Sequence, residues 1–206
     1  YMEKYGATRE HMATHIVNNR NNALLNEKGY WYNHRPEVIT VDDYLNSRMV
    51  SDPFCLYDCD IPVHGCAAWI LTTADRAKEA PNGAAYVVGT AQGVSVRDVT
   101  LGPLEVDQVG VARVSKRLWE RTGLSPKDID TANLYDGFSV YVYINLEGYG
   151  FCKEGEAFEW IQDGRIELGG ELPFNTSGGN SGEGRLHGAT HISEAILQAM
   201  HRAGPR

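Results

Sequence analysis

The sequence predicts an α/β protein in which helices alternate with buried strands. Two short apolar runs, residues 66–72 and 84–91, have the length and composition of strands covered on both faces of a sheet. Val111, Val114 and Leu118 recur at helical spacing, and a second set of apolar residues does so near the C-terminus. Of the 206 residues, 42% are hydrophobic and 22% charged, so the chain can bury one substantial core.

In the first quarter of the chain, the sequence predicts two helices joined by an aromatic loop. A polar helix is expected over residues 8–25, and its narrow apolar face needs a partner to cover it. The stretch 26–36 contains three consecutive aromatic residues, and we expect a loop that lies against a ligand or a second subunit. Thr40 and Asp43 have capping-box spacing, which predicts a short helix through Met49.

The second half has clearer helix signals. The helix that contains Val111 is expected to end at Gly123, and Ser125 with the proline after it begins a new turn. A short strand is expected to follow and to run through Leu134. The stretch 138–149 fits two patterns, because its valines alternate as in a strand while its aromatic residues have helical spacing.

The charge and the hydropathy exclude several classes of protein. The formal net charge of −8 argues against binding to nucleic acid and to anionic membrane surfaces, because either polyanion would be repelled. The sequence has no apolar run of membrane-spanning length and no basic-then-apolar signal segment. We therefore expect a cytoplasmic protein that binds neither nucleic acid nor membranes.

Cysteine and histidine spacing gives no metal site. The four cysteines are too few and too irregular for a disulfide scaffold or a zinc site, so we expect reduced, mostly buried thiols. His187 with His191 and His11 with His15 have i, i+4 spacing but lack the glutamate of the zinc-protease pattern. No metal is expected.

The most informative segment is a glycine-rich loop at residues 175–188, which contains five glycines and leads into the last helix. Such a loop lets backbone N–H groups approach an anion or a developing oxyanion at a helix N-terminus. A phosphate-binding loop would need Lys and then Ser or Thr where this chain has Arg185 and Leu186. A dinucleotide-binding loop would need closer glycine spacing. An acyl-thioester site, in which glycine N–H groups bind the carbonyl or its enolate, fits best.

Two motifs in the second half are fairly specific. Residues 134–138 read Leu-Tyr-Asp-Gly-Phe, and residues 175–189 run from Asn-Thr-Ser-Gly-Gly to Gly-Arg-Leu-His-Gly-Ala. Together they resemble the C-terminal half of thiolase-superfamily proteins, above all the actinobacterial lipid-transfer branch that includes steroid side-chain aldolases. A weaker match is His-Gly-Cys-Ala-Ala at residues 64–68, where the family usually has Asp-Gly-Ala-Ala.

The resemblance implies a layered αβαβα fold, of which this chain covers mainly the C-terminal half. It implies a loop and helical region at 1–64, the last strand and helix of the N-terminal half at 65–82, and the C-terminal half at 83–206. It also implies a helix over 138–149 and two further strands beyond the last helix. We therefore expect a fragment of a longer protein, or a subunit whose core another chain completes.

Departures from the family pattern indicate the chemistry. Thiolases that perform Claisen chemistry usually have Asn or His at the position of Tyr135 and a catalytic histidine at the position of Arg185. Neither motif of this chain contains a cysteine. The resemblance thus implies the aldolase branch, which cleaves a β-hydroxyacyl-CoA by a retro-aldol reaction without a covalent cysteine intermediate.

Retro-aldol cleavage needs a base for the proton of the β-hydroxyl group. Tyr135 and His187 are candidates, and Tyr135 would need a nearby cation such as Arg185, or a helix N-terminus, to lower the phenol pKa enough for it to act as a base. Each also has a structural alternative: Tyr135 as a half-buried aromatic residue, His187 as a helix-terminal residue bonded to backbone, and Arg185 as the partner of Asp136.

The reaction also needs donors that stabilise the thioester enolate. Gly178 and Gly179, with the amides that open the last helix, are candidates for the enolate oxygen. Asp136, beside Tyr135, is a further candidate for substrate binding. No cofactor is expected beyond the coenzyme A of the substrate.

The function that the resemblance implies is cleavage of a β-hydroxyacyl-CoA side chain, most simply a steroid one, into propionyl-CoA and a ketosteroid. It also implies a homodimer and an OB-fold, zinc-ribbon partner protein. Two alternatives stay open: a thiolase or acyltransferase of the sterol-carrier-protein-x type with a nucleophilic cysteine elsewhere, and a non-catalytic subunit that binds acyl-CoA or lipid.

Overall fold

The computed structural model describes residues 1–93 and 104–206 and is mainly helical. The two strands of the described residues, β1 (Met49–Ser51) and β2 (Phe54–Cys55), pair in antiparallel fashion. The helices are α1 (Met2–Tyr5), α2 (Arg9–Ala23), α3 (Tyr30–His34), α4 (Val41–Leu45), η1 (Leu56–Asp58), α5 (Ala74–Ala77), α6 (Leu104–Thr122), η2 (Pro126–Asp128), α7 (Val140–Gly148), α8 (Ala157–Trp160), α9 (Gly179–Gly182) and α10 (Ala189–Ala199).

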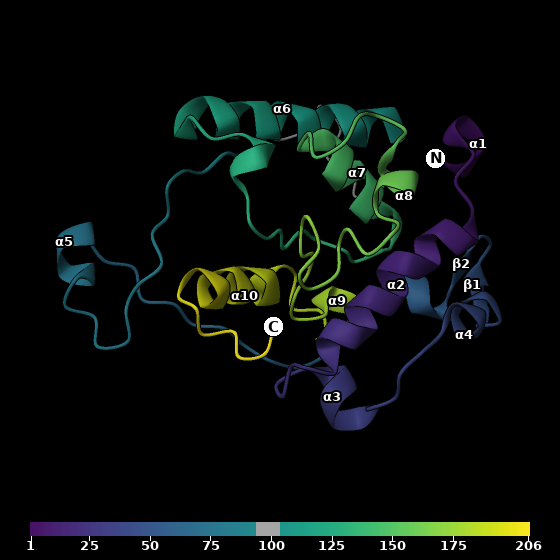
Figure 1. Ribbon diagram of the computed structural model, residues 1–206, viewed down its shortest axis with the longest axis horizontal. Coiled ribbons are helices and arrows are strands. Elements are labelled where there is room, and N and C mark those ends of the chain that lie inside the picture. The colour runs from purple at the N-terminus through teal and green to yellow at the C-terminus, as the bar shows by residue number, and fades with distance from the viewer. Residues whose placement is uncertain (94–103) are drawn as a thin grey trace.

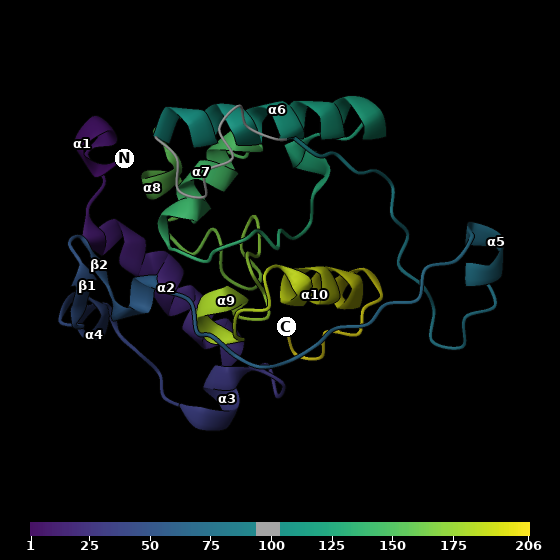
Figure 2. The same cartoon turned by 180° about the vertical axis from the view of Figure 1, so that it is seen from behind.

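Two groups of helices frame the molecule. Figure 1 shows α6 and α7 packed together along the top, α2 crossing the lower part, and α9 and α10 between them. The view from behind in Figure 2 shows the same arrangement, with α5 far from the rest on a long extended segment. No helix of the described residues is long and apolar enough to cross a membrane.

The polar helix α2 is buried because asparagines in it and just beyond it bind the backbone of the glycine-rich loop and of the segment before that loop. The side chain of Asn18 donates to the carbonyl of Ile166 at 3.2 Å, and that of Asn22 donates to the carbonyl of Phe174 at 3.1 Å. Asn26, just beyond the helix, donates to the carbonyl of Ser177 at 3.1 Å. The expected helix over residues 8–25 is therefore confirmed, and its partner is a loop whose backbone acceptors it satisfies.

A buried carboxylate joins the first quarter of the chain to α7. Asp58 accepts hydrogen bonds from the Tyr44 hydroxyl at 2.9 Å, the Cys55 amide at 2.7 Å and the Ser139 hydroxyl at 2.6 Å. Its own backbone carbonyl accepts from the Ser139 amide at 3.0 Å. This network fixes the segment after η1 against the start of α7, where the candidate site lies.

Apolar packing also holds the first quarter of the chain against α7. Buried side chains from α2, α7, α8 and the segment before the glycine-rich loop form one cluster, which includes Ile16, Leu146, Ile161, Ile166 and Phe174. Five aliphatic or aromatic side chains of this size contribute roughly 1.5–3 kcal/mol each on burial, an upper bound because the unfolded chain is partly compact.

Several helix predictions are confirmed. The helix that contains Val111 ends at Thr122 with Gly123 in the left-handed region, and the ambiguous stretch 138–149 forms α7. Ser125 and Asp128 cap the turn η2. The helix that Thr40 begins ends at Leu45 rather than at Met49.

The two strands predicted from apolar runs are wrong for this structure. Residues 66–72 and 84–91 are extended but unpaired within the described residues, and Ile70 and Leu71 are 96% and 86% exposed. A strand needs a neighbouring strand for its backbone groups, and the described residues supply none beside these segments. The strand through Leu134 is likewise reduced to a single bridge between Ala132 and Phe174.

The aromatic stretch 26–36 is partly helical rather than a loop. It contains α3, and Trp31 is 1% exposed beneath the guanidinium of Arg20, which lies 4.1 Å from the ring centroid. Trp31 therefore belongs to the core, while Tyr32 is 40% exposed and free to contact other molecules.

We predict that Asp58→Ala lowers the free energy of unfolding by about 3 kcal/mol, because it leaves two buried hydroxyl groups without their acceptor. Urea unfolding followed by circular dichroism measures this change. Asp75→Ala is the matched control, since the Asp75 side chain is 93% exposed and should change stability by less than about 0.5 kcal/mol. Equal stability of the two variants would show that the Asp58 network does not support the fold.

Candidate active site

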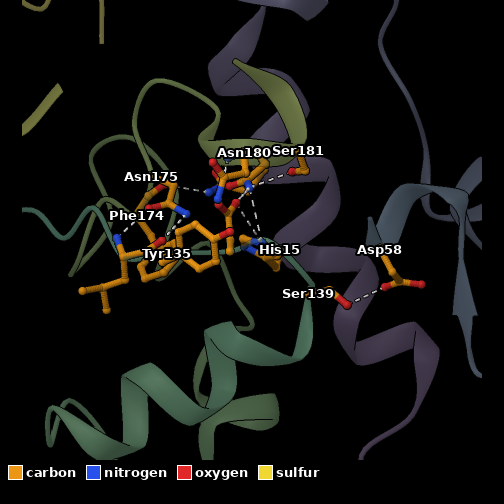
Figure 3. Close-up of polar contacts among 12 residues, drawn as sticks. His15, Asp58, Tyr135, Ser139, Phe174, Asn175, Asn180 and Ser181 are labelled. Atoms are coloured by element: carbon orange, nitrogen blue, oxygen red, sulfur yellow. Dashed lines mark hydrogen bonds and ion pairs between the residues drawn. The ribbon is translucent and has the colours of Figure 1, made fainter. Parts of the chain in front are cut away.

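The two motifs of the second half meet at the carboxylate of Asp136, which is completely buried. Its Oδ1 accepts from the Asn180 amide at 2.8 Å and lies 3.1 Å from Nε2 of His191. Its Oδ2 accepts from the side chain of Asn19 at 2.7 Å. Because a carboxylate only accepts, His191 donates its Nε2–H. Figure 3 shows His15, Asn180 and Ser181 converging on this cluster, with Tyr135 beside it.

The surroundings keep Asp136 ionised. Burial alone would raise its pKa, but the hydrogen bond and charge of His191, the nearby His15 and the Asn180 amide outweigh burial and lower the pKa below the ordinary carboxyl value. His15 behaves in the opposite way, because burial lowers its pKa to about 4 despite the attraction of Asp136 and Asp58. At neutral pH, His15 is therefore an uncharged neighbour whose Nε2 lies 3.3 Å from the Asn19 amide group.

This geometry corrects the expected role of Asp136 in substrate binding. The carboxylate has its partners on α2, in the glycine-rich loop and on α10, and no part of it reaches the surface. Arg185 does not pair with it, as one sequence interpretation allowed, but with Asp60. Asp136 therefore has a structural role, because it connects α2, the glycine-rich loop and α10.

The glycine-rich loop is fixed to the Tyr-Asp-Gly-Phe turn by Asn175. The Asn175 side chain accepts from the Leu134 amide at 2.8 Å and donates to the Leu134 carbonyl at 3.0 Å. The Asn175 amide donates to the carbonyl of Ala132 at 2.9 Å. These bonds bring the turn that carries Tyr135 next to the start of the glycine-rich loop.

The loop glycines are required for close packing. A Cβ on Gly179, whose φ is +57°, would overlap Oδ2 of Asp136. The amide of Gly178 donates to the carbonyl of Asn175 at 2.8 Å, so this N–H group is occupied inside the loop. The expectation that Gly178 donates to an enolate oxygen is therefore wrong. The role expected for Gly179 stays a prediction.

A third segment, absent from the predicted site, completes it. The amide of Asp60 donates to the carbonyl of Gly137 at 3.3 Å, and the amide of Ile61 donates to the carbonyl of Asn180 at 3.1 Å. The amide of Arg185 donates to the carbonyl of Ile61 at 2.8 Å. Asp60 is thereby placed between the turn that carries Tyr135 and the loop that carries Arg185.

The side chains of Arg185 and Asp60 form an ion pair at this junction. Nη1 of Arg185 lies 3.3 Å from Oδ2 of Asp60, and the Asp60 side chain is only 12% exposed. Burial raises the pKa of Asp60, and the positive charge of Arg185 only partly opposes that rise. His187 also acts on Asp60 electrostatically, so both loop residues predicted for the site lower the pKa of the same carboxyl group.

Tyr135 lies at the surface of this cluster and is 36% exposed. Its ring packs over Gly137, where a Cβ would overlap the ring atoms. Burial and the charge of Asp60 raise the pKa of Tyr135 more than Arg185 lowers it. The role of Tyr135 as a base stays a prediction, and burial above all, with the charge of Asp60, favours the neutral phenol over the phenolate in this structure. Tyr135 is a neutral phenol and a hydrogen-bond donor.

His187 and Arg185 line a cavity of about 310 Å³, together with residues of the 62–67 segment. This cavity adjoins a larger one of about 1230 Å³, because Val63, Gly65, Cys66 and Leu186 line both. The larger cavity extends to the loop after α2 and to the C-terminal residues.

All four cysteines are free, and their burial differs from the expectation of mostly buried thiols. Cys55 is buried, Cys59 and Cys152 are half-buried, and Cys66 is exposed at the shared wall of the two cavities.

Sequence reasoning missed three site residues. His15 and His191 were considered only as metal-ligand pairs, yet both lie beside Asp136. Asp60 lies outside both motifs and carried no spacing signal. The sequence Asp58-Cys59-Asp60, with two acids before an Ile-Pro break, was the one feature that could have drawn attention to it.

Comparison with known proteins identifies related enzymes. The chain is 38% identical over 202 residues to a 17-hydroxy-3-oxo-4-pregnene-20-carboxyl-CoA lyase of Mycobacterium tuberculosis, a match that covers 96% of this chain and 52% of that protein. It is also 38% identical over 205 residues to a steroid side-chain-cleaving aldolase of Thermomonospora curvata, covering 95% of this chain and 50% of that protein. The chain thus spans about half the length of these curated relatives.

A solved structure and a family model place the fold. A structure described as an Ltp2-ChsH2(DUF35) aldolase superposes with a TM-score of 0.82 at 32% identity and covers 99% of this chain and 55% of its own. This similarity confirms a thiolase-like fold of which the chain is a part. The family model for the thiolase C-terminal domain-like family matches residues 102–206, more than half of the chain. The chain therefore belongs to the thiolase C-terminal domain-like family.

Proposed function

We propose that this chain is part of a CoA-thioester lyase that cleaves a β-hydroxyacyl-CoA by a retro-aldol reaction, releasing propionyl-CoA and a ketosteroid. The observation that carries the proposal is the ion pair of Arg185 and Asp60 beside the smaller cavity, with Tyr135 and His187 within electrostatic range of the same carboxylate. The curated relatives with 38% identity, named as a steroid CoA lyase and a steroid aldolase, support the same reaction class.

The site offers the electrostatics that the reaction requires. Cleavage of the Cα–Cβ bond leaves negative charge on the thioester enolate, and a fixed cation or hydrogen-bond donor stabilises that charge. Arg185 is held by its ion pair with Asp60 and is still 34% exposed toward the cavity, so its guanidinium can meet the enolate oxygen. Tyr135, as a neutral phenol within electrostatic range of Arg185, can donate a hydrogen bond or a proton.

The cavities suit a bulky acyl group. Cavities that bind drug-sized molecules measure about 300–1,000 Å³, and the larger cavity here, at about 1230 Å³, exceeds that range. Its wall continues into the smaller cavity beside Arg185, so a large acyl chain could occupy one while its thioester lies near the other.

We also propose that the active assembly includes a second protein component and a second copy of this chain. Support for the component comes from the two-part description of the superposed aldolase structure. The family resemblance implies that this component is an OB-fold, zinc-ribbon protein. The exposed apolar residues of segments 66–72 and 84–91 provide surface that further protein can cover.

The first prediction concerns activity. The intact protein with its partner component should release propionyl-CoA and a ketosteroid from a steroid β-hydroxyacyl-CoA, measured by mass spectrometry of both products. A β-ketoacyl-CoA incubated with free CoA is the comparison, because a thiolase would cleave that substrate instead. If no product above background forms from the β-hydroxyacyl-CoA, the proposed function is contradicted.

The acyltransferase alternative is favoured by one observation, the exposed thiol of Cys66 at the wall of both cavities. A covalent thiol mechanism would be abolished by iodoacetamide and by Cys66→Ser if that thiol were the nucleophile. We predict that Cys66→Ser keeps β-hydroxyacyl-CoA cleavage within about threefold of wild type, since retro-aldol cleavage needs no thiol intermediate. Loss of turnover in Cys66→Ser, with its fold intact, would favour the acyltransferase.

The next prediction concerns Tyr135. Tyr135→Phe removes the acidic hydroxyl and keeps the ring that packs over Gly137, so substrate binding should survive while kcat falls by about 10²-fold or more. Steady-state kinetics and thermal unfolding of the same preparation measure both effects. Tyr86→Phe, at an exposed tyrosine of the extended segment, is the matched control. Turnover within a few-fold of wild type would make Tyr135 a structural aromatic residue.

A further inference from the structure

Two segments that are far apart in the sequence form the wall between the smaller and the larger cavity. Residues 62–67 supply one part of it and residues 184–187 the other, and both segments line both cavities. The amide of Arg185 donates to the carbonyl of Ile61 at 2.8 Å, and Pro62 forms a parallel bridge with Arg185. The wall is therefore attached to the loop that carries Arg185, and a substrate that occupies both cavities has to cross it.

The two segments fit together through reciprocal contacts. Gly184, whose φ is +123°, faces Val63, and a Cβ at this glycine would lie only 2.8 Å from Cγ1 of Val63. Gly65 faces Leu186, and a Cβ there would lie 3.1 Å from Cδ1 of Leu186. Each segment thus places a glycine opposite a branched side chain of the other. Contacts this close fix the two branched side chains in the wall.

Leu186 is the bulky apolar residue of the wall that lies closest in sequence to the reactive groups. It stands between Arg185 and His187, which both line the smaller cavity, and it lines the larger cavity as well. Its backbone carbonyl accepts from the Ala189 amide at 3.1 Å, so the start of α10 holds the residue in place. Its side chain is only half-buried, which leaves part of it open to a substrate.

The first segment of the wall is attached at its other end too. Nε1 of Trp69 donates to Oγ of Ser193 on α10 at 3.2 Å, and Ser193 lines the larger cavity. The segment is thus held by the Arg185 loop at one end and by α10 at the other. A wall that is fixed at both ends keeps its width, so the side chains in it limit the bulk of a group that crosses it.

We propose that Leu186 selects substrates by the bulk of the acyl group next to the thioester. With the thioester beside Arg185 in the smaller cavity and the acyl group in the larger one, the acyl carbons that follow the thioester pass Leu186. This inference rests on the proposed CoA-lyase function and adds a specificity-determining residue to that site. An apolar side chain takes no part in proton transfer, so the role of Leu186 concerns binding alone.

The size of the effect follows from the packing of apolar groups. One methylene more or less in an apolar pocket changes the discrimination between two ligands by about 10–200-fold. Phe at position 186 would extend a ring from the wall, so a fused-ring acyl group would clash with it while a straight chain could pass beside it. Ala at this position would remove the obstacle and would not increase the discrimination against rings.

The test measures the binding of two CoA thioesters that lack the β-hydroxyl group and so do not undergo retro-aldol cleavage, a steroid carboxyl-CoA and decanoyl-CoA. Isothermal titration calorimetry of the intact protein with its partner component gives both Kd values. Leu186→Phe should raise the Kd of the steroid thioester by about 10-fold or more and that of decanoyl-CoA by less than about threefold. Leu56→Phe is the matched control and should bind both ligands as wild type does, because Leu56 is 42% exposed and lines neither cavity.

Gly65→Ala tests the same contact from the opposite segment. The added methyl group would displace the side chain of Leu186 and narrow the crossing, so the Kd of the steroid thioester should rise relative to that of decanoyl-CoA. In a Leu186→Ala background the displaced side chain is absent, and Gly65→Ala should leave the ratio of the two Kd values unchanged. This pair of measurements decides the proposal if Leu186→Phe does not fold. An equal effect of Gly65→Ala in both backgrounds, or no effect in either, would overturn it.

The remaining outcomes separate this inference from the proposed function. Equal weakening of both ligands by Leu186→Phe would mean that the CoA portion they share passes Leu186, and unchanged binding of both would mean that neither portion does; either result overturns the inference. If Leu186→Phe shifts the selectivity but wild type releases no propionyl-CoA from a steroid β-hydroxyacyl-CoA, the lyase function falls and the selecting role of Leu186 stands. A wild-type protein that binds neither thioester contradicts both proposals.

Discussion

The carboxylate of Asp136 is the constraint on which the site depends. Removing a charge from water costs several kcal/mol unless donors replace the water, and three groups from separate elements do so here. They are Asn19 on α2, the Asn180 amide in the glycine-rich loop and His191 on α10. A buried charge that is satisfied only when three elements meet favours one arrangement of them, and Tyr135 is the next residue along the chain.

The reactive groups lie in front of this carboxylate, where their partners decide their chemistry. Arg185 on its own would lower the pKa of Tyr135, but burial and the charge of Asp60 together raise that pKa and favour the neutral phenol. The same ion pair fixes the guanidinium of Arg185, which lines the smaller cavity. Substituting one motif residue therefore changes the ionisation of its neighbours as well as its own contact with substrate.

The sequence predicted the parts of this site that local signals specify. Tyr135 and Arg185 stood out because both replace residues that thiolases usually have, whereas the bonds by which Asn175 joins the Tyr135 motif to the glycine-rich loop were not predicted. Asp60 could not be predicted, because its place depends on backbone bonds to Gly137 and Asn180, which lie far along the chain. Long-range pairing of that kind leaves no spacing pattern in a single sequence.

For the fold, the sequence predicted the helices correctly but not the strands. Capping residues and apolar spacing located α2 and α6, because helices are made of local hydrogen bonds. Segments 66–72 and 84–91 have the composition of strands, but a strand forms only beside another, and none lies beside them in the described part of the chain. These segments have the apolar side chains of strands, but those side chains stay exposed because no partner strand covers them in the described part of the chain.

The most direct test of this account is the free energy of unfolding of Asp136→Asn against wild type, measured in urea as a function of pH. The pKa of Asp136 is lowered in the folded protein, so its stabilisation is present above the unfolded value of about 3.9 and is lost as the pH falls through the folded value. We expect a loss of at least about 2 kcal/mol at pH 7 that narrows below about pH 4. A difference under about 0.5 kcal/mol at pH 7 would contradict the central role of this carboxylate.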